Sequence, residues 1–438
     1  MFPSNIKSMQ RYSLNKCQQR KIVMKNNKLS VFLFVLTCSA ILLLEGCHKD
    51  NTRTYTILKP VYKDKASVLA AINGSATESF LHPGKIYIKD NLIFINEIDK
   101  GIHVIDNSDP SHPQQISFLD IPGNEDIAVK GNILYADMYA DLLAIDITDP
   151  QSVHVTGKVF HFFMEREFVN GFQPDSNQVI VDWIKKDTTV VIDQNPVVPP
   201  IDDCRACMFM LSEASSVPAT NGQAGSMAKM VLLKDYLYAI SERHSLGIVS
   251  VTNASSPHFE NNISAGFDLE TIYPFEDKLF LGSAEGMFMF DVSDPVQPFS
   301  IGTFSHGRAC DPVVSDGKYA YITLHAGTEC GGNANELDVV NIENLDQSQL
   351  VKTYPMTKPT GLCKDGSLLF VCDASVVKIY DAADPSDLKL LNKINSNEPY
   401  DVIAHNNVAL VVDADGLYQY DYSNVSNIRQ LSFISVKE

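Results

Sequence analysis

The sequence predicts an all-β protein, a seven-bladed β-propeller with four-stranded blades over residues 84–438. Three observations support this fold class. A short pattern of an aliphatic run, an Asp or polar residue and a turn recurs seven times. The copies follow one another at roughly the 40-residue spacing that is typical of propeller blades. Apolar residues make up 45% of the chain, which is enough for a large core, and helical periodicity is scarce.

The seven copies share an aliphatic run that ends in a turn. They read GIHVIDNSDP from Gly101, LLAIDITDP from Leu142, LGIVSVTNASSP from Leu246, GMFMFDVSDP from Gly286, LDVVNIENLD from Leu337, VVKIYDAADP from Val376 and GLYQYDYSNV from Gly416. Asn, Asp and Pro supply turn geometry and end the pairing of strands. The third, fifth and seventh copies lack the Asp-Pro ending but keep the aliphatic core.

The first unit shows how each blade is built. Its four strands are predicted at residues 84–89, 92–96, 101–106 and 114–119, with a tight turn at 89–91 and the Asp-Pro turn at 107–110. Short runs rich in β-branched and aromatic residues favour buried strands. The later units begin near Glu125, Ser226, Leu269, Cys310, Thr360 and Tyr400.

This repeated core resembles the LVIVD repeat family of propellers, which occurs in bacterial surface and secreted proteins. The resemblance extends over residues 84–438. It implies the scaffold but no particular activity, because a fold of this kind hosts many functions.

The start of the chain resembles a bacterial lipoprotein signal. A basic stretch at residues 24–28 precedes an apolar run at 29–44, and Cys47 follows directly after Leu44-Glu45-Gly46. The resemblance implies that Cys47 is acylated and that the protein is anchored by lipid in a bacterial cell envelope, at the outer membrane. The alternative is a single spanning helix, but this apolar run is shorter than the about 20 residues that a span needs.

The remaining organisation follows from these two features. Residues 1–46 are expected to be an upstream extension and signal peptide, and 47–83 a tether and capping segment with a strand near 55–58 and a helix near 66–72. Residues 161–225 interrupt the repeat between the second and third blades, and long insertions in compact domains are commonly functional. The net charge of −18 argues against nucleic acid as a partner.

Six cysteines follow Cys47, and an even number in an oxidising compartment predicts disulfides. Cys363 and Cys372 flank a predicted hairpin turn, so we expect them to face each other across two strands. The other four candidates are Cys310, Cys330, Cys204 and Cys207. The last two form a CxxC motif that reads as a disulfide, two thiols or half of a zinc site.

Carboxylates recur where the innermost strands begin. They are Glu125, Asp126, Asp268, Glu270, Asp311 and Asp401. Innermost strands line the central channel of a propeller, so we expect these side chains at its mouth. Asp126, Glu270, Asp311 and Asp401 are candidate ligands of a divalent cation, calcium or magnesium, because such ions prefer oxygen ligands. The alternative is that each carboxylate accepts hydrogen bonds from its own turn. That structural alternative is favoured for the aspartates after the third strands, Asp106, Asp146, Asp291, Asp381 and Asp421.

His306, Arg308 and Asp311 lie close together in the sequence beside this mouth and are candidate ligand-binding groups. His325 and Glu329 lie in the Gly-rich loop that follows, and with Glu270 they could supply acid–base groups. No nucleophile motif accompanies these residues. We therefore predict a binding or scaffold module for an envelope protein or a glycan, which uses the loop face around the channel. The alternative is a metal-assisted hydrolase or lyase that uses the channel carboxylates.

Overall fold

The structure, a computed structural model, describes residues 52–74, 77–191, 223–307, 312–326 and 332–436. Eight of the predicted sites lie outside these ranges: Cys47, Cys204, Cys207, Arg308, Cys310, Asp311, Glu329 and Cys330. The chain divides into two units, one of residues 1–55 and 187–198 and a larger one of residues 56–186 and 199–438. In the smaller unit the hydroxyls of Thr54 and Thr189 lie 3.0 Å apart.

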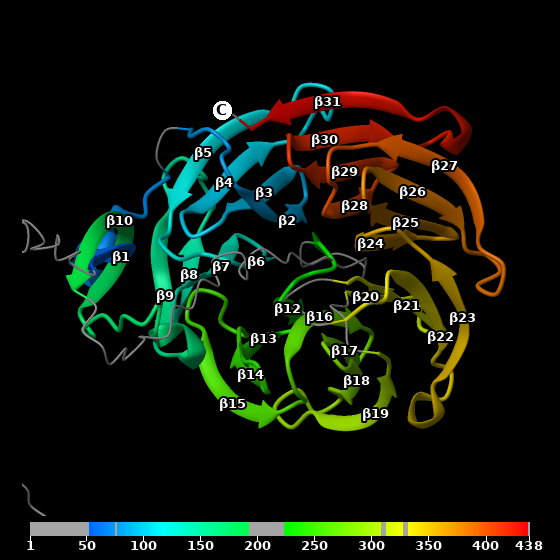
Figure 1. Ribbon diagram of the computed structural model, residues 1–438, viewed down its shortest axis with the longest axis horizontal. Coiled ribbons are helices and arrows are strands. Elements are labelled where there is room, and N and C mark those ends of the chain that lie inside the picture. The colour runs from blue at the N-terminus through cyan, green and yellow to red at the C-terminus, as the bar shows by residue number, and fades with distance from the viewer. Residues whose placement is uncertain (1–51, 75–76, 192–222, 308–311, 327–331, 437–438) are drawn as a thin grey trace, which may run out of the picture. The chain divides into compact units, whose positions relative to one another are not determined.

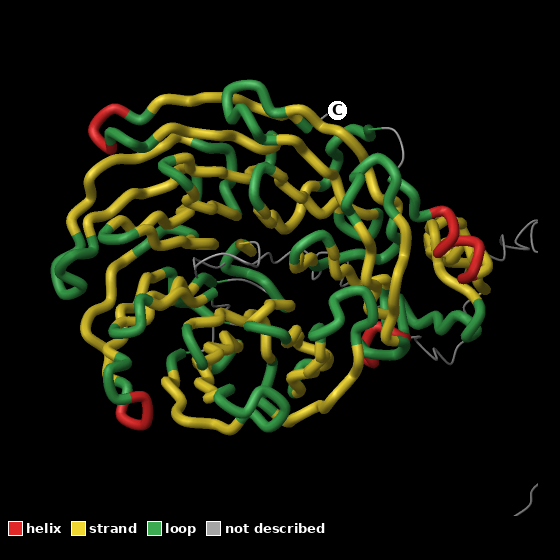
Figure 2. The backbone as a smooth tube through the Cα atoms, turned by 180° about the vertical axis from the view of Figure 1, so that it is seen from behind, coloured by secondary structure: helices red, strands yellow, loops and turns green. Residues whose placement is uncertain are grey.

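The larger unit contains seven antiparallel sheets, each built from four consecutive strands, and this confirms the predicted seven-bladed propeller (Figure 1). Neighbouring blades contact each other through their innermost strands, in sequence order around the ring. The seventh blade returns to the first, because the first strand of blade 1 contacts the second strand of blade 7. The ring is therefore closed. Figure 2 shows the same strands from behind.

The strands follow the predicted units closely. Blade 1 comprises β2 (Pro83–Lys89), β3 (Leu92–Glu97), β4 (Gly101–Asp106) and β5 (Gln114–Asp120); blade 2 comprises β6 (Ile127–Lys130), β7 (Ile133–Met138), β8 (Asp141–Asp146) and β9 (His154–Val159). Blade 3 comprises β12 (Met230–Leu233), β13 (Tyr236–Glu242), β14 (Ser245–Ser250) and β15 (His258–Ser264); blade 4 comprises β16 (Leu269–Phe275), β17 (Lys278–Ser283), β18 (Gly286–Asp291) and β19 (Phe299–Ser305). Blade 5 comprises β20 (Val313–Ser315), β21 (Tyr319–Leu324), β22 (Glu336–Asn341) and β23 (Gln349–Pro355); blade 6 comprises β24 (Pro359–Asp365), β25 (Leu368–Asp373), β26 (Val376–Asp381) and β27 (Lys389–Asn395). Blade 7 comprises β28 (Asp401–His405), β29 (Val408–Asp413), β30 (Gly416–Asp421) and β31 (Arg429–Ser435).

The Asp that ends the third strand in five of the seven blades has a structural explanation. The carboxylates of Asp106, Asp146 and Asp291 each accept a hydrogen bond from the backbone N–H two residues later, at 2.8–2.9 Å. Asp381 and Asp421 do the same at 3.0 Å. These aspartates hold the turns into the outer strands, so the structural alternative is confirmed for them.

Apolar side chains dominate the packing between blades, and polar side chains add hydrogen bonds at the junction of blades 1 and 7. Ile86, Ile93 and Ile95 of blade 1 pack with Ile403 and Leu410 of blade 7 in one buried cluster. The side-chain amides of Asn107 and Gln419 exchange two hydrogen bonds, at 3.1 and 2.7 Å, across the same junction. Both contacts join segments more than 300 residues apart in the sequence, and they hold the ring shut.

Tyrosine hydroxyls join successive blades. Tyr135 of blade 2 donates to the carbonyl of Ala254 in blade 3 at 2.8 Å, and Tyr238 of blade 3 donates to Pro295 in blade 4 at 3.0 Å. Tyr273 of blade 4 donates to Ser315 of blade 5 at 2.8 Å. A buried tyrosine thus fills the space between two sheets and gives its hydroxyl a partner.

Two long strands and several short helices lie outside the blades. Strand β1 (Thr52–Asp64) pairs with β10 (Gln178–Val191), and helix α2 (Lys65–Ala71) matches the predicted helix. Asp64 caps this helix by accepting from the N–H of Ser67 at 2.8 Å. Val68 and Ile72 bury against the core shared by blades 1 and 2. Single-turn helices occur at η1 (Met164–Glu167), η3 (Leu345–Gln347) and η4 (Val425–Asn427). None of the helices in the described ranges has the length and apolar character needed to cross a membrane.

The predicted disulfide between Cys363 and Cys372 is wrong. Both cysteines are buried free thiols. Cys363 of β24 pairs with Phe370 of β25, so Cys372 lies two residues further along and its direct partner on β26 is Val377. The two cysteines therefore sit diagonally on one face of the sheet, within one apolar cluster. Burial raises the pKa of the Cys363 thiol above its usual range.

Candidate functional site at the mouth of the channel

The centre of the ring is occupied by the chain itself. Residues 223–229, which we call the channel segment, connect the insertion to the first strand of blade 3. Strand β11 (Gln223–Ala224) adds a fifth strand to blade 1 by pairing with Ile88 and Tyr87 of β2, the innermost strand. The N–H of Gly225 continues this pairing by donating to the carbonyl of Ile86 at 3.1 Å. In Figure 1 this green segment enters the middle of the ring.

The channel segment contacts the inner strands of further blades. The carbonyl of Ala228 accepts from the N–H of Ile272 in blade 4 at 2.8 Å, and the N–H of Lys229 donates to Asp126 beside blade 2 at 2.6 Å. The Ser226 hydroxyl lies 3.4 Å from the N–H of Leu362 in blade 6, to which it serves as acceptor. Ser226, Met227 and Ala228 are buried. The channel is therefore filled by residues of this chain, and the predicted third-blade start at Ser226 belongs to this filling rather than to a strand.

The carboxylates of blade 2 are neutralised by cations that sequence reasoning missed. Asp126 makes a buried ion pair with Lys85 at 2.8 Å. Glu125 lies 3.2 Å from Arg166 and 3.8 Å from the ammonium group of Lys229. Burial acts to raise the pKa of Glu125, but Arg166 and Lys229 outweigh it and lower this pKa to about 2. Glu125 is thus ionised and paired rather than available to a cation.

Asp137 forms the centre of this charged network. Its carboxylate accepts from the N–H groups of Glu125 and Asp126 at 3.0 and 2.8 Å and from the side chain of Asn124 at 2.9 Å. Arg166, from the insertion, forms an ion pair with it. Three carboxylates therefore share three cations, Lys85, Arg166 and Lys229. This balanced arrangement, in which the carboxylates of Asp126 and Asp137 are buried, fixes the entry to blade 2.

The other predicted site residues lie apart from this network. Asp401, the first residue of β28, is fully buried beside the channel segment, where a Cβ on Gly225 would lie 2.6 Å from its Oδ2 atom. Glu270 is partly buried in β16. His306 follows β19 and donates from Nδ1 to the carbonyl of Gly307 at 2.6 Å. No group of three or more His, Cys, Asp or Glu residues among the described ranges is placed to hold a metal ion. The predicted cluster of Asp126, Glu270 and Asp401 is therefore not formed by these three residues; Asp126 is already occupied by Lys85 and Lys229.

A pocket of about 340 Å³, which we call the mouth pocket, lies where blades 5, 6, 7 and 1 meet the channel segment. Its wall comes from the segments that enter inner strands, including His82, Lys358 and Tyr400, and from turns between second and third strands, including Ala374 and Ala414. Met227 of the channel segment and His325 complete it. All these segments belong to one face of the propeller, because strand entries and second-to-third turns lie at the same edge of every blade.

His325 lies in the wall of the mouth pocket. It is 2% exposed, and neither ring nitrogen has a hydrogen-bond partner within the described part of the chain. Burial and the nearby Lys358 lower the pKa of His325 to about 4, so the imidazole is neutral at pH 7. It therefore presents one donor and one acceptor nitrogen. The sequence singled out His325 as an accompanying residue but not as the centre of the site.

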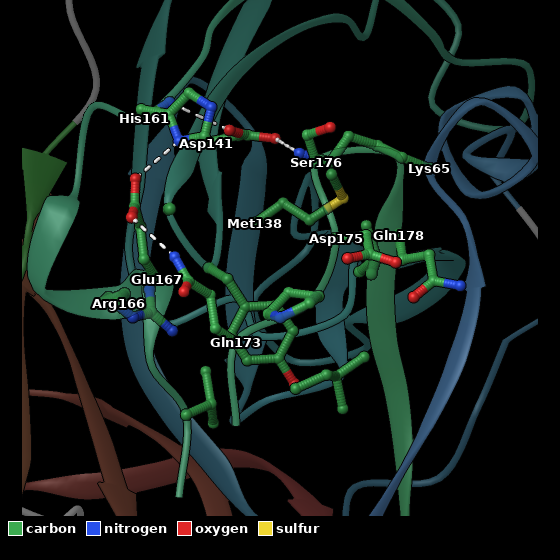
Figure 3. A pocket seen from close by; sticks show the side chains of 16 residues that line it. Lys65, Met138, Asp141, His161, Arg166, Glu167, Gln173, Asp175, Ser176 and Gln178 are labelled. Atoms are coloured by element: carbon green, nitrogen blue, oxygen red, sulfur yellow. Dashed lines mark hydrogen bonds and ion pairs between the residues drawn. The ribbon is translucent and has the colours of Figure 1, made fainter. Parts of the chain in front are cut away.

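A second, smaller pocket of about 150 Å³ lies between blade 2 and the insertion (Figure 3). Four of its titratable side chains form two pairs. His161 contacts Glu167 at 2.7 Å, and Lys65 donates to Asp141 at 2.8 Å. In Figure 3 dashed lines mark the contacts between these side chains. This internally satisfied set stabilises the insertion against blade 2 and leaves the mouth pocket as the better candidate site.

The chain carries LVIVD repeats. The profile described as the LVIVD repeat matches residues 83–119 and 124–160, which are the first two blades. A search of curated proteins finds no match.

Solved structures with a similar course of the chain include three bacterial proteins. BamB from Moraxella catarrhalis is 8% identical, with 83% of this chain and 97% of that chain covered and a TM-score of 0.46. The periplasmic gluconolactonase PpgL from Pseudomonas aeruginosa is 12% identical, with 88% and 97% covered and a TM-score of 0.46. PorZ, a surface component of the type-IX secretion system of Porphyromonas gingivalis, is 10% identical, with 82% and 38% covered and a TM-score of 0.47.

Proposed function

Because this chain is a seven-bladed propeller that carries LVIVD repeats, we propose that it is a lipid-anchored envelope protein that works as a binding or scaffold module. Its recognition surface is the loop face around the channel, with the mouth pocket at its centre. The partner is an envelope protein or a glycan. The membrane is contacted through the acylated Cys47 alone, because a chain of net charge −18 is repelled by anionic lipid and by nucleic acid.

One observation carries this proposal: the channel segment lies inside the channel, and a pocket of about 340 Å³ lies at the channel mouth. Because the channel segment occupies the channel, a partner cannot bind inside it, and we expect the partner to bind at the surface around the channel mouth. Pockets that bind small groups commonly combine apolar walls with a few polar side chains. The mouth pocket has this composition, with Met227, Pro399 and Ile98 beside His325 and Lys358.

The enzymatic alternative has less support. A metal-assisted hydrolase or lyase needs a divalent ion with an open position and a proton-transferring group beside it. Asp126, which was expected to be a ligand, is paired with Lys85, and Glu125 is paired with Arg166. These ion pairs favour a structural role for both carboxylates, so binding is the better proposal.

Partner capture from envelope extracts with variants of the two opposite faces tests the proposal. Lys358→Glu changes the mouth face, whereas Asp109→Lys changes a third-to-fourth-strand turn on the other face; both side chains are exposed. We expect Lys358→Glu to lose the partner that the unmodified protein captures and Asp109→Lys to keep it. The proposal fails if the mouth variant keeps the partner and the opposite variant loses it. Acyl labelling that persists in Cys47→Ala would contradict the anchor.

A further inference from the structure

The wall of the mouth pocket is largely apolar. Leu81, Ile98, Met227, Pro399 and Ala414 contribute to it, and Leu81 is 41% exposed. Met227 comes from the channel segment, and the flexible side chain of methionine adapts to partners of different shape. The volume of about 340 Å³ is smaller than one turn of a helix, which is about 10 Å wide and about 5.4 Å long. The pocket therefore has room for one large side chain but not for an entire helix.

The hydroxyl groups of the wall already have partners within the chain. The hydroxyl of Thr360 donates to the carbonyl of Pro399 at 2.8 Å, and that of Tyr400 donates to the carbonyl of Pro83. These two bonds join blade 6 to blade 7 and blade 7 to blade 1. They hold the wall in place before a partner binds, which lowers the entropy cost of binding.

The buried ionisable groups of the wall offer a ligand equally little. Asp413 accepts hydrogen bonds from the Ser396 hydroxyl and from the N–H of Asn397, at 2.5 and 3.0 Å. The ring nitrogens of His325 are buried within the wall and present no hydrogen-bonding atom to the pocket. A strongly polar ligand would give up its hydrogen bonds to water without replacing them. An apolar group is therefore the chemistry that fits the interior of the pocket.

Two opposite charges accompany this apolar interior. Lys358, in the segment that enters blade 6, and Glu398, in the segment that enters blade 7, line the pocket and are exposed. A purely anionic or purely cationic ligand would be attracted by one of them and repelled by the other. A segment with an apolar residue between an acidic and a basic residue complements both charges.

A second apolar side chain on the same face indicates a partner larger than the pocket. Phe267, in the segment that enters blade 4, is 65% exposed and contacts the ring of His244, with ring centroids 5.4 Å apart. The channel segment extends between the two places, because Met227 lines the pocket and the carbonyl of Ala228 accepts from Ile272 of blade 4. A small molecule in the pocket would leave Phe267 in water, whereas a protein interface of about 800 Å² can cover both.

We propose that the mouth face binds a protein and that one large apolar side chain of this partner fills the mouth pocket. An acidic residue beside that side chain pairs with Lys358, and a basic residue on its other side pairs with Glu398. Burial of the apolar side chain supplies the affinity, and the two charges select the sequence around it. This inference rests on the proposed binding function and, of the two partner classes named there, assigns the protein.

Selection of random linear peptides, displayed on phage, against the purified full chain tests the inference. We expect the enriched peptides to share one large apolar residue between an acidic and a basic residue. Ala414→Trp, which places an indole in the pocket, should weaken the binding of such a peptide at least about tenfold. Ala383→Trp serves as the control and should bind normally, because this exposed alanine lies in a third-to-fourth-strand turn on the opposite face.

A second pair of variants covers the case that Ala414→Trp does not fold. Leu81→Ser removes exposed apolar surface from the wall and should also weaken the peptide. Leu350→Ser is its control, because Leu350 is 49% exposed and lies at the start of β23, near the opposite face.

Charge reversal tests the two rim contacts. Lys358→Glu should lose the peptide. Lys358→Glu combined with Glu398→Lys should bind a peptide in which the acidic and the basic residue have been exchanged.

The remaining outcomes overturn the inference. If no peptide is enriched, or if the enriched peptides bind Ala414→Trp and Leu81→Ser as well as the unmodified chain, no apolar side chain uses the pocket. Equal losses in Ala414→Trp and Ala383→Trp would place the binding surface elsewhere. A glycan on an array that binds the unmodified chain but not Lys358→Glu, with no peptide enriched, would overturn the protein partner and leave the proposed binding function intact. Failure of peptides, glycans and envelope proteins alike to bind the mouth face would remove the proposed function as well.

Discussion

Two buried histidines illustrate how single residues divide between stability and function. His103 stacks on Phe80, with ring centroids 4.1 Å apart, and contacts the buried carboxylate of Glu97. His325 is equally buried but has no such partner within the described residues. Removal of a partner from a buried polar pair leaves the other group unsatisfied, whereas removal of an unsatisfied group does not.

This difference predicts opposite effects of the same substitution. His103→Leu should lower the free energy of unfolding by about 3 kcal/mol, because Glu97 would lose a buried partner. His325→Leu should leave that free energy unchanged or raise it. Urea unfolding at pH 7 measures both, as a shift of the midpoint at constant slope. A loss of stability in His325→Leu as large as in His103→Leu would show that His325 is a structural residue.

His325 also predicts a pH dependence of stability. Its pKa is lowered from 6.5 to about 4 in the folded protein, so the unfolded chain takes up a proton at a higher pH than the folded chain. Above pH 6.5 the imidazole is neutral in both the folded and the unfolded chain, so the free energy of unfolding keeps its full value. As the pH falls from 6.5 to about 4, protonation of the unfolded chain lowers this free energy by up to about 3 kcal/mol. His325→Leu should lose less stability than the unmodified protein between pH 6.5 and 4.5. Equal losses in both proteins would contradict the neutral buried state.

At the scale of elements, the channel segment depends on a close approach of backbone and side chain. A Cβ on Gly225 would lie 2.6 and 3.0 Å from the two carboxylate oxygens of Asp401, whereas a Cβ on Gly307 would meet no atom within 4 Å. Gly225→Ala should therefore destabilise the protein by about 1–3 kcal/mol, and Gly307→Ala should be neutral. Thermal unfolding of the two variants is the measurement. A neutral Gly225→Ala would mean that the segment does not pack against β28.

The register of the hairpin formed by β24 and β25 predicts that its two cysteines are reduced. Because Cys363 and Cys372 are offset by two residues, both should be reduced in protein prepared without reductant. Iodoacetamide in denaturant, followed by peptide mass analysis, should alkylate both. The folded protein should protect them, because burial holds the pKa of each thiol above its usual range. A peptide recovered with the two cysteines linked would contradict the observed register.

At the scale of the whole molecule, the repeat made the fold predictable. Each blade carries its own aliphatic runs and turn residues, so local patterns and the global fold agree. The first blade shows this agreement, since the predicted 101–106 strand is found as β4 without change. The repeat also predicted where each innermost strand begins, and Asp126 and Asp401 were therefore placed correctly at such starts.

The charged network beside blade 2 was less predictable, because two of its three cations, Arg166 and Lys229, come from non-repeating segments. Lys85 of blade 1, Arg166 of the insertion and Lys229 of the channel segment reach the carboxylates of blade 2 only after the ring has closed. No periodicity in the sequence connects these cations to Glu125 or Asp126. The path of residues 223–229 through the channel was not predicted either, because a segment after an irregular insertion has no repeating pattern.

Hydrogen–deuterium exchange of residues 223–229, measured by mass spectrometry, tests most directly whether the closed ring is filled by its own chain. The N–H groups of Gly225 and Lys229 donate to Ile86 and Asp126, and the residues between them are buried. We predict that this peptide exchanges as slowly as the inner strands β24 and β28. Exchange as fast as that of the exposed turn at 405–407 would show that the channel is open, and the mouth pocket would lose its floor.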